Sequence, residues 1–328
     1  MGIKHLNQFL RDNCSKKSIQ HVHLKTLANK TIVVDTYIYM YKFISDNALL
    51  ENMYLFISAF KEYNITPIFV FDGKPPPEKK ALLNRRYLEK KEAENKYAEI
   101  QKLLSPDSLT ELTDQQKADA LKDMDLLKKQ FIRVREGDVK QVKSLMESFG
   151  MSYYDAPGEA DEVCAKLSLS GKAWGCLSDD MDMFLYGCPF VLRGFNLLKH
   201  SVIVYDTESI LNDLEMSSDD FREILVISGT DYNIYSGTNL HETIKWFNEY
   251  NKYRHNKNKY VGFYVWLLKN TKYIRDYREL IQTYLLFKLP INKDDPYDIS
   301  YNKHDMNVDD IRNIMEKEGF VFIKPLVS

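Results

Sequence analysis

The sequence predicts an α/β protein in which a parallel sheet is flanked by helices. Two short runs of β-branched and aromatic residues, 32–35 and 68–72, each end in an aspartate. A third run, 172–177, leads into Ser178-Asp179-Asp180. Helical periodicity occupies the segments between these runs, and strands that alternate with helices are typical of a parallel sheet.

The predicted helices fall into two groups. Those in the first part of the chain belong with the predicted strands and cover residues 4–13, 37–63, 137–149 and 158–169. Those near the other end of the chain cover residues 261–268, 277–287 and 308–318. The second group follows a stretch rich in Tyr, Asn and Lys, and we expect it to pack on the body of the protein.

One long segment, 74–135, differs in composition from the rest of the chain. After Pro75-Pro76-Pro77 it is rich in Lys, Arg and Glu, and it has few large apolar residues. The pattern predicts one or two solvated helices, broken near Ser105-Pro106, that leave the globular body. Composition alone favours an ordinary charged surface helix with i,i+4 ion pairs, so a special role requires other evidence.

Composition and charge exclude several classes of protein. Among 328 residues there are 13 glycines and 10 prolines, too few for a collagen-like or low-complexity chain. The longest apolar stretch, 261–268, is shorter than the ~18 residues of a membrane helix, so no membrane partner is expected. The 4 cysteines form no C-x-x-C pair, which favours a reducing, intracellular setting. A net charge of −2 confines any nucleic-acid contact to local basic patches.

Acidic residues gather at the predicted carboxyl ends of the strands. Asp35, Asp72 and Asp180 end or follow a strand, and open α/β sheets bind their ligands at that edge. Further acids stand in turns and at helix starts elsewhere in the chain: Glu159, Asp161, Asp182 and Asp231. For an isolated acid such as Glu159, a favourable interaction with the helix dipole would be explanation enough. The number of acids at strand ends favours a shared site.

Clustered carboxylates require a cation. They repel one another and raise each other's pKa values, so a fold that gathers them needs compensating positive charge. All-oxygen ligands without Cys or His nearby select Mg²⁺ or Mn²⁺. Two such ions held ~3.5 to ~4 Å apart would activate a water and stabilise the leaving oxygen of a phosphodiester. The acids therefore predict a site for hard divalent cations, and a pair of such cations would be suited to phosphodiester chemistry.

In their order and spacing, these motifs resemble those of flap endonucleases and the xeroderma-pigmentosum-G-type 5′ nucleases. The matching segments are Met1-Gly2-Ile3, Val34-Asp35, Phe71-Asp72-Gly73-Lys74-Pro75-Pro76, Ala156-Pro157-Gly158-Glu159-Ala160-Asp161, Asp179-Asp180-Met181-Asp182 and Gly229-Thr230-Asp231-Tyr232. Each motif is weak alone, but their common order is a specific signal. The resemblance implies a PIN-like parallel sheet flanked by helices, a helical arch inserted at 74–135 and a helical C-terminal region.

The resemblance also implies an organisation and an activity. The N-terminal nuclease region covers 1–103 and includes the start of the arch, the internal nuclease region covers 137–235, and the helical C-terminal region covers 236–328. The implied activity is hydrolysis of DNA phosphodiester bonds at or near junctions of 5′ flaps with duplex, as an endonuclease or 5′ exonuclease. The implied cofactors are two Mg²⁺ ions, with Mn²⁺ as a substitute.

By the same resemblance, the family's metal ligands correspond to Asp35, Asp72, Glu159, Asp161, Asp180, Asp182 and Asp231. Asp161 stands where flap endonucleases carry Glu. Its shorter side chain is expected to weaken or lengthen one metal contact. The neighbouring Glu162 is the residue that could compensate.

Other residues are implied to contact nucleic acid. Lys79 and Arg86 match the basic pair of the arch that steers the scissile phosphate, and a spacing of about two helical turns places both on one face. Arg85 is an alternative to Arg86, and a solvated basic face is the alternative for all of them. Tyr41 matches an aromatic that stacks on a displaced base, although a buried core tyrosine fits almost as well. Gly2 is expected near the entrance of the active site.

Two departures from the family pattern change the expected partners. Flap endonucleases continue with a Gly-x-Gly-Pro-Lys helix-turn-helix that grips duplex DNA and a monovalent ion. Here Tyr235-Ser236-Gly237-Thr238-Asn239-Leu240 keeps one glycine, Gly237, and lacks Pro-Lys, so this helix-turn-helix is degenerate and a weaker grip is expected. The chain ends at Ser328 without the Gln-initiated aromatic box of flap endonucleases, so recruitment by a sliding clamp through that box is not expected.

The sequence leaves two alternatives to a flap-directed nuclease. A 5′ exoribonuclease shares the start of the fold, which makes RNA an alternative substrate. An inactive relative could bind nucleic acid or assist assembly, but retention of every acid position opposes this reading because unneeded carboxylates repel one another. The expected setting is the nucleus or another site of DNA replication, or a viral factory for a viral protein. The expected state is a monomer.

Overall fold

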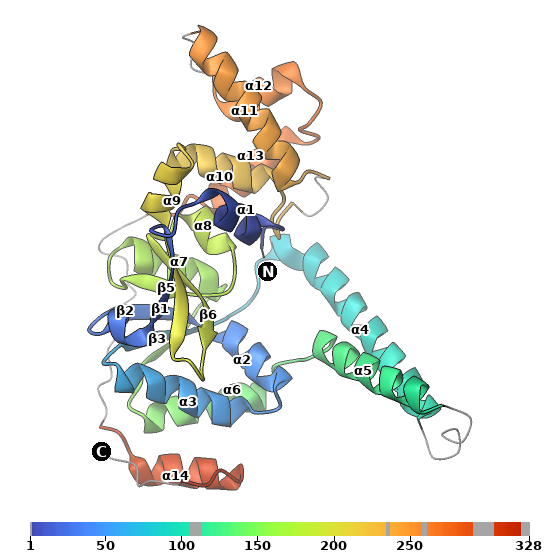
Figure 1. The fold of residues 1–328 in the computed structure, drawn as a ribbon, viewed down its shortest axis with the longest axis vertical. Helices are drawn as coiled ribbons and strands as arrows, with labels where there is room; N and C mark the ends of the chain where they lie inside the picture. The colour runs from blue at the N-terminus through green and yellow to red at the C-terminus, as the bar shows by residue number, and fades with distance from the viewer. Residues whose placement is uncertain (1, 105–112, 234–236, 258–260, 291–304, 323–328) are drawn as a thin grey trace.

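The computed structural model describes residues 2–104, 113–233, 237–257, 261–290 and 305–322. A central sheet lies among helices, an arm of two long helices projects from it, and further helices extend beyond one end of the body (Figure 1). The strands are β1 (Ile19–His23), β2 (Thr31–Asp35), β3 (Thr66–Phe71), β4 (Tyr153–Asp155), β5 (Gly175–Leu177), β6 (Phe190–Asn196) and β7 (Ser201–Asp206).

The helices surround the sheet, form the arm or build the C-terminal region. Those of the body are α1 (Leu6–Asn13), α2 (Thr36–Ser45), α3 (Leu49–Glu62), α6 (Glu136–Ser148), α7 (Ala160–Leu169), α8 (Asp182–Tyr186), α9 (Thr207–Asp213) and α10 (Ser218–Ile227), with the short 3₁₀ helices η1 (Leu24–Leu27) and η2 (Pro77–Lys79). The arm consists of α4 (Lys80–Leu103) and α5 (Asp114–Gln130). The C-terminal helices are α11 (Leu240–Lys257), α12 (Phe263–Asn270), α13 (Tyr277–Leu286) and α14 (Val308–Lys317).

The sheet is mixed. Within the described residues it has 7 strands in the order β1-β7-β6-β5-β2-β3-β4. Strands β6, β5, β2, β3 and β4 are parallel, whereas β7 is antiparallel to both β6 and β1. The predicted α/β fold with a parallel, helix-flanked sheet is confirmed for the five central strands, and β7 and β1 add an antiparallel edge to it. The link 197–200 between β6 and β7 is too short for a crossover, so the two strands form an antiparallel hairpin.

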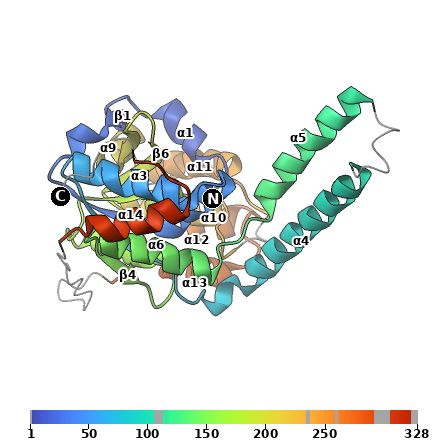
Figure 2. The same ribbon diagram turned by 90° about the horizontal axis from the view of Figure 1, so that it is seen from below.

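Both faces of the central strands are buried, which explains their continuous apolar runs. Along β2, Val33 packs into the core on one face, and Ile32 and Val34 pack into the core on the other. Helices α1, α7, α8 and α10 contribute to the first core, and α2, α3, α6 and α14 contribute to the second (Figures 1 and 2). The helices thus fix the sheet from both sides and leave its edge of carboxyl ends for the site.

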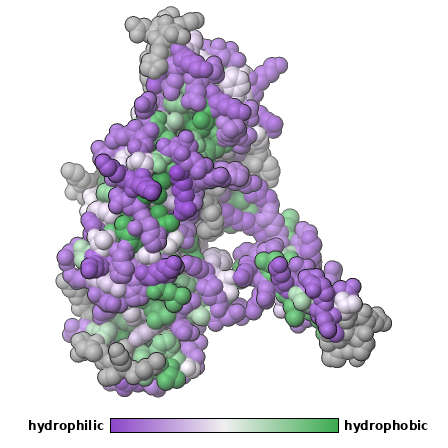
Figure 3. All heavy atoms as spheres, in the orientation of Figure 1, coloured by the Kyte–Doolittle hydropathy of each residue, from purple (hydrophilic) through white to green (hydrophobic). Residues whose placement is uncertain are grey.

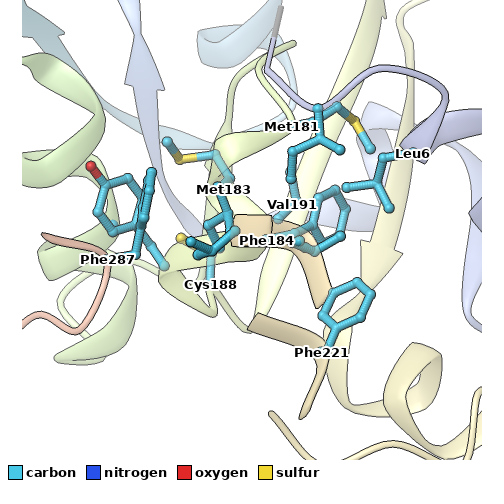
Figure 4. Close-up of a cluster of buried hydrophobic side chains, with 14 of the residues drawn as sticks. Leu6, Met181, Met183, Phe184, Cys188, Val191, Phe221 and Phe287 are labelled. Carbon is cyan, nitrogen blue, oxygen red and sulfur yellow. The ribbon is translucent and has the colours of Figure 1, made fainter. Parts of the chain in front are cut away.

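The C-terminal region shares the first core with the sheet. Figure 4 shows Leu6 of α1, Phe184 of α8 and Phe221 of α10 in one cluster, which also includes Val191 of β6. Phe287, which follows α13, is buried in the same core. The C-terminal helices are therefore packed on the body, as predicted, and side chains from them reach the vicinity of the sheet.

The arm is the charged segment that the sequence singled out. Helices α4 and α5 pack on one another and project from the body in both ribbon views (Figures 1 and 2). Only Leu82 and Ala93 of α4, and no residue of α5, are buried. This low burial explains the polar composition. The predicted break near Ser105-Pro106 lies outside the described residues.

Two further predictions are corrected or refined. The pattern over 37–63 is two helices, because Asn47, with a φ of 53°, ends the first in the left-handed conformation that Asn tolerates.

None of the helices in the described part of the chain is long and apolar enough to cross a membrane. The cysteines of the described residues are free, and all but Cys14 are buried.

Candidate active site

The parallel strands bring the first two acids together. Asp35 ends β2, and Asp72 directly follows β3, its parallel neighbour in the sheet. Ser178 Oγ donates a hydrogen bond of 3.0 Å to Asp35 Oδ2, and the backbone N–H of Ala160 donates one of 2.8 Å to Asp72 Oδ1. Each carboxylate is therefore oriented by a donor from another strand end or helix start.

The segment after β5 adds two buried acids. The N–H of Asp180 donates to Ser178 Oγ over 3.1 Å, and the N–H of Asp182 donates to Asp180 Oδ1 over 3.0 Å. Asp180 is 6% exposed and Asp182 is 2% exposed. Asp179 has a different task, because its Oδ1 accepts the N–H of Gly194 over 2.7 Å and so ties this segment to β6.

Glycines bring the loop after β3 close to the start of α7. The N–H of Gly73 donates to the carbonyl of Gly158 over 2.7 Å. A Cβ at Gly73 would overlap the carbonyl oxygen of Ala156, so the approach requires glycine. Glu159 precedes the first residue of α7 and Asp161 lies in its first turn. This close approach of the two segments places Glu159 near Asp72, and Asp161 near Asp35, Asp180 and Asp182.

A hydrogen-bonded turn after α10 presents the last acid. Asn233 Oδ1 accepts from the N–H of Thr230 over 2.6 Å and from its Oγ1 over 2.8 Å. This turn fixes Asp231 and Tyr232. Tyr232 donates its hydroxyl to Glu159 Oε2 over 2.8 Å. The sequence reasoning assigned no role to Tyr232, although its place inside a metal-site motif was the signal that could have indicated one.

Cations from the base of the arm reach these acids. Lys79, in η2, pairs with Glu159 Oε1 at 2.7 Å, and Arg86, on α4, pairs with Asp231 Oδ2 at 2.8 Å. Both residues therefore reach the acids, although Lys79 lies in η2 and Arg86 on α4, so they do not share one continuous helix. Arg85 points elsewhere: it is half-exposed and pairs with Glu89 on its own helix at 3.6 Å. Of the two neighbouring arginines, the structure brings only Arg86 to the acids.

Burial and mutual repulsion dominate the electrostatics of the site. Burial, followed by the charge of Asp72, raises the pKa of Asp35 to about 8. Burial and neighbouring carboxylates also raise the pKa values of Asp161 and Asp182 well above the ordinary range. For Lys79, burial opposes the charged form, but Glu159, Asp161 and Asp231 together outweigh it and raise the pKa. The site is thus short of positive charge.

The nearby Glu162 does not compensate for the short Asp161. It is exposed on α7 and pairs with Lys166 over 2.8 Å. Asp161 itself lies close enough to Asp35, Asp180 and Asp182 for their charges to act on it. The expectation that Glu162 could take over is therefore not supported, whereas Asp161 lies within the cluster.

Gly2 lies directly over the acids. A Cβ at this residue would stand 2.5 Å from Asp180 Oδ1 and 2.6 Å from Asp182 Oδ1. Gly2 also has a φ of 73°, which side chains rarely adopt. The position therefore requires glycine for two reasons, and it borders the carboxylates as the sequence predicts.

A cleft of about 680 Å³ opens beside the cations, between α2, α4 and the end of α5. Tyr41 lines it, is 39% exposed, and lies with its ring 5.1 Å from the ammonium of Lys90. It is not a buried core tyrosine. None of the described residues that line this cleft is acidic, and Figure 3 shows the molecule hollowed between the body and the arm. The cleft combines apolar or aromatic surface with positive charge.

Gly237 lies just before α11 and close to Arg275. Its φ is 68°, and a Cβ there would stand 3.0 Å from Cζ of Arg275. Asn239 caps α11 by accepting the N–H of Glu242 over 3.0 Å. The residue in the place of the family's second glycine thus serves as a helix cap. Tyr235 and Ser236 lie outside the described residues.

The donor set fits hard divalent cations. Its members are all carboxylates, and Asp182 Oδ1 is buried without a hydrogen-bond partner. Within the part of the chain that the structure describes, no three His, Cys, Asp or Glu side chains already form a ready-made ion cage. Lys79 forms an ion pair with Glu159, and Arg86 forms one with Asp231. These two cations therefore balance part of the negative charge of the carboxylates.

Fold and site together define an α/β protein whose strand-end carboxylates meet cations from an inserted helical arm. Family models agree with this class: the XPG N-terminal domain matches residues 1–93, and the XPG I-region matches residues 150–231. Both regions occur in order, and the gap between them contains most of the arm. The chain belongs to the XPG family.

Curated relatives point to the same family. The chain is 30% identical over 251 residues to flap endonuclease 1 of Komagataella phaffii, a match that covers 71% of this chain and 63% of the relative. It is 29% identical over 266 residues to flap endonuclease 1 of Cryptosporidium parvum, which covers 71% of this chain and 50% of the relative. The chain thus spans between half and two thirds of the length of these relatives.

Solved structures share the fold. The catalytic core of Rad2 in complex with DNA substrate superposes with a TM-score of 0.65 at 21% identity, covering 97% of this chain and 96% of that one. Human GEN1 in complex with Holliday junction DNA gives a TM-score of 0.60 at 20% identity, and the match covers 97% of this chain and 74% of the GEN1 chain. Flap endonuclease-1 from Methanococcus jannaschii gives a TM-score of 0.59 at 20% identity, and the match covers 92% of this chain and 90% of that chain.

Proposed function

We propose that the protein is a structure-specific 5′ nuclease that hydrolyses phosphodiester bonds of DNA at or near the junction of a 5′ flap with duplex. The observation that carries this proposal is the meeting of strand-end carboxylates with Lys79 and Arg86 of the arm. Its relatives named flap endonuclease 1 support the same reaction class. In this proposal, the regions 1–103 and 137–235 carry out catalysis. The region 236–328 contacts the duplex.

The carboxylates would hold two divalent cations, Mg²⁺ or Mn²⁺. When bound, such ions activate a water and offset the charge of the phosphodiester and its leaving oxygen. Asp35, Asp72 and Asp180 orient their oxygens through donors from neighbouring elements, as described above. Glu159, Asp161, Asp182 and Asp231 complete the proposed ligand set.

The arm would hold the substrate. An incoming phosphodiester offers Lys79 and Arg86 an anion in place of the carboxylates they now pair with, and Arg86 can contact a phosphate through two N–H groups. The acid-free cleft beside them suits an unpaired nucleotide, because Tyr41 offers a stacking face and Lys90 a phosphate contact. Such contacts select the shape of a nucleic acid, not its sequence.

The test compares purified protein on labelled 5′-flap DNA, nicked duplex, four-way junction and single-stranded RNA, with Mg²⁺, Mn²⁺ or EDTA. Cleavage of the flap near its junction, dependent on metal and absent in Asp182→Ala, would support the proposal. Degradation of RNA alone would identify a 5′ exoribonuclease instead. Binding without cleavage of any substrate in either metal would identify an inactive binding or assembly factor.

The proposed setting follows from the proposed reaction. A nuclease of replication and repair intermediates acts where DNA is copied, which means the nucleus or a viral factory, according to the host. We propose that it acts there as a monomer, since one chain supplies every acid and both cations. Localisation of a tagged protein with newly synthesised DNA and its mass in solution test these two statements.

A further inference from the structure

Tyr232 contacts both partners of an ion pair at the site. Its hydroxyl donates to Glu159 Oε2 over 2.8 Å. Lys79 Nζ lies 2.7 Å from the other carboxylate oxygen of the same glutamate. The same ammonium lies 4.7 Å from the centre of the Tyr232 ring. One side chain therefore contacts a proposed metal ligand at its polar end and a proposed phosphate-contacting cation at its face.

The two contacts restrict different groups. A hydrogen bond to a carboxylate is directional, so the phenol fixes the plane of Glu159 and leaves Oε1 for Lys79. A ring face attracts an ammonium that is shielded from water, and Lys79 is only 7% exposed. Without the ring, the long and flexible lysine stem would have one fewer constraint.

Tyr232 is held in turn by the C-terminal region. Phe287, at the end of α13, meets its ring edge-on with centroids 5.6 Å apart. Phe287 also packs against Tyr186 of α8, with ring centroids 5.0 Å apart. Figure 4 shows Phe287 within the buried cluster. The ring of Tyr232 is therefore packed against the buried core, which restricts its rotamers.

We propose that Tyr232 is a positioning residue for the reaction. It holds Lys79 and Glu159 at a fixed distance from one another, so that the cation and the carboxylate act on the same phosphodiester. The proposal rests on the proposed nuclease function for its kinetic consequence, but the placement of Lys79 is a property of the protein alone. Two kinds of measurement therefore test it.

The first measurement is kinetic. Tyr232→Phe removes the hydrogen bond but keeps the ring, and Tyr232→Met removes both. We expect the single-turnover rate on flap DNA to fall about tenfold in the first variant and about 100-fold in the second. The Kd for the same DNA should stay within about twofold, because a positioning residue acts after binding.

A matched control is Tyr264→Phe. Tyr264 is another buried tyrosine, and its hydroxyl donates to the carbonyl of Glu223 over 2.8 Å, in the same half of the protein. A purely structural effect of losing a buried phenol would lower the rate equally in Tyr264→Phe and Tyr232→Phe. That equality, or a wild-type rate in Tyr232→Met, would overturn the proposal.

The second measurement needs neither DNA nor metal. An amine-reactive acylating reagent labels lysines at a rate that depends on their exposure, and mass spectrometry reports each site. Lys79 should react at least about fivefold faster in Tyr232→Met than in wild type, and near the wild-type rate in Tyr232→Phe. Lys143, which pairs with Asp155 and lies over Phe71 and Tyr153, provides the internal standard.

The two measurements separate the two proposals. A wild-type protein that cleaves no substrate overturns the proposed function, whereas the labelling of Lys79 still reports whether Tyr232 holds it. Unchanged labelling of Lys79 in Tyr232→Met overturns the positioning proposal even where cleavage is lost. Should Tyr232→Met fail to fold, the rate of Tyr232→Phe against Tyr264→Phe decides.

Discussion

The guanidinium of Arg86 lies 2.8 Å from Oδ2 of Asp231, a residue 145 positions further along the chain. This ion pair joins the base of the arm to the turn after α10. Lys79 makes the equivalent contact with Glu159 at 2.7 Å. The cations that would face a phosphate therefore already face carboxylates, and substrate and divalent ions should compete with these internal pairs.

The basic pair should act on chemistry more than on binding. Lys79→Ala and Arg86→Ala should each lower the single-turnover rate on flap DNA by about 100-fold, because each removes a charge aimed at the reacting phosphate. The Kd should change by less than about fivefold, since many other contacts bind the DNA. Rapid-quench kinetics and fluorescence anisotropy measure the two quantities.

Arg85→Ala is the matched control for this prediction, because Arg85 is the next residue on α4 and pairs with Glu89. It should leave the rate near that of wild type. The double variant of Lys79 and Arg86 should lose less than the product of the single losses if the two act as a unit. Rates that fall in proportion to affinity would mean that the arm is only a solvated basic face.

Asp182→Asn should separate stability from function. At neutral pH the folded protein confines several repelling carboxylates, and burial raises the pKa of Asp182 well above its ordinary value. The neutral amide should therefore raise the Tm of the metal-free protein, while cleavage falls about a thousandfold or more because a ligand is lost. Thermal unfolding in EDTA and in Mg²⁺, with cleavage assays, measures both.

Glu162→Gln is the control for Asp182→Asn. Glu162, like Asp182, lies in the first turn of a helix, but it is exposed and pairs with Lys166. It should leave both cleavage and the gain in Tm on Mg²⁺ addition unchanged. An Asp182→Asn protein that keeps the full Mg²⁺-dependent gain in Tm would remove this residue from the proposed ligand set.

The metal-free protein should lose stability as pH rises. In the unfolded chain Asp35 titrates near 3.8, whereas burial and Asp72 raise its folded pKa to about 8. Between these values the folded state binds more protons than the unfolded state, so the free energy of unfolding falls with increasing pH. The contribution is complete below the unfolded pKa and is lost as pH passes the folded pKa.

Tm values in EDTA across this range measure the effect. Asp35→Asn should flatten the dependence, because its amide does not titrate. Saturating Mg²⁺ should also flatten it if the ions bind the ionised carboxylates. A wild-type Tm that rises between about pH 5 and about pH 8 in EDTA would contradict the assigned burial of this cluster.

The degenerate turn before α11 should grip duplex DNA weakly. Asn239 occupies the place of a glycine and caps the helix, and His241 stands where the family has a lysine. Lengthening the duplex downstream of the flap beyond one helical turn should therefore add little affinity, and K⁺ in place of Na⁺ should change little. Compared with family members that keep the full turn, the slope of log Kd against log salt concentration should be shallower by about one unit for each missing phosphate contact.

A marked gain in affinity with duplex length would contradict this prediction, and Arg275 is a residue that could cause such a gain. Arg275 packs its guanidinium against Gly237 and could supply the missing cation. A marked gain in affinity with duplex length that disappears in Arg275→Ala would show that this arginine rebuilds the site. A gain that survives the change would point to the Lys- and Asn-rich stretch at 251–259 instead.

Local patterns predicted the strands that carry the acids. The apolar residues 32–34 and 68–71 are buried, so their apolar character is continuous, and the aspartates that follow them are conspicuous in the sequence. Strand β1 has no such signal: its residues are mostly exposed or half-buried at an edge. Strand β1 was therefore missed because an edge strand needs little apolar burial.

The acids were identifiable by motif, but their supporting contacts were not. Ser178 and Tyr232 each bind an acid that is 143 or 73 residues away, and no local pattern indicates such a distance. Arg86 and Arg85 were equivalent in sequence. They are separated only by the rotation of α4 relative to Asp231, which the packing of the arm's base determines.

The strand order also has a consequence for synthesis of the chain. Strand β1 pairs with β7, so residues 19–23 find their partner in the sheet at 201–205. Strands β5, β6 and β7 separate β1 from β2, although β1 and β2 are neighbours in sequence. Closing such long loops costs entropy and slows folding. A nascent chain that has reached only the arm holds β2 and β3 with an open edge, and we expect its sheet to assemble only after β7 leaves the ribosome.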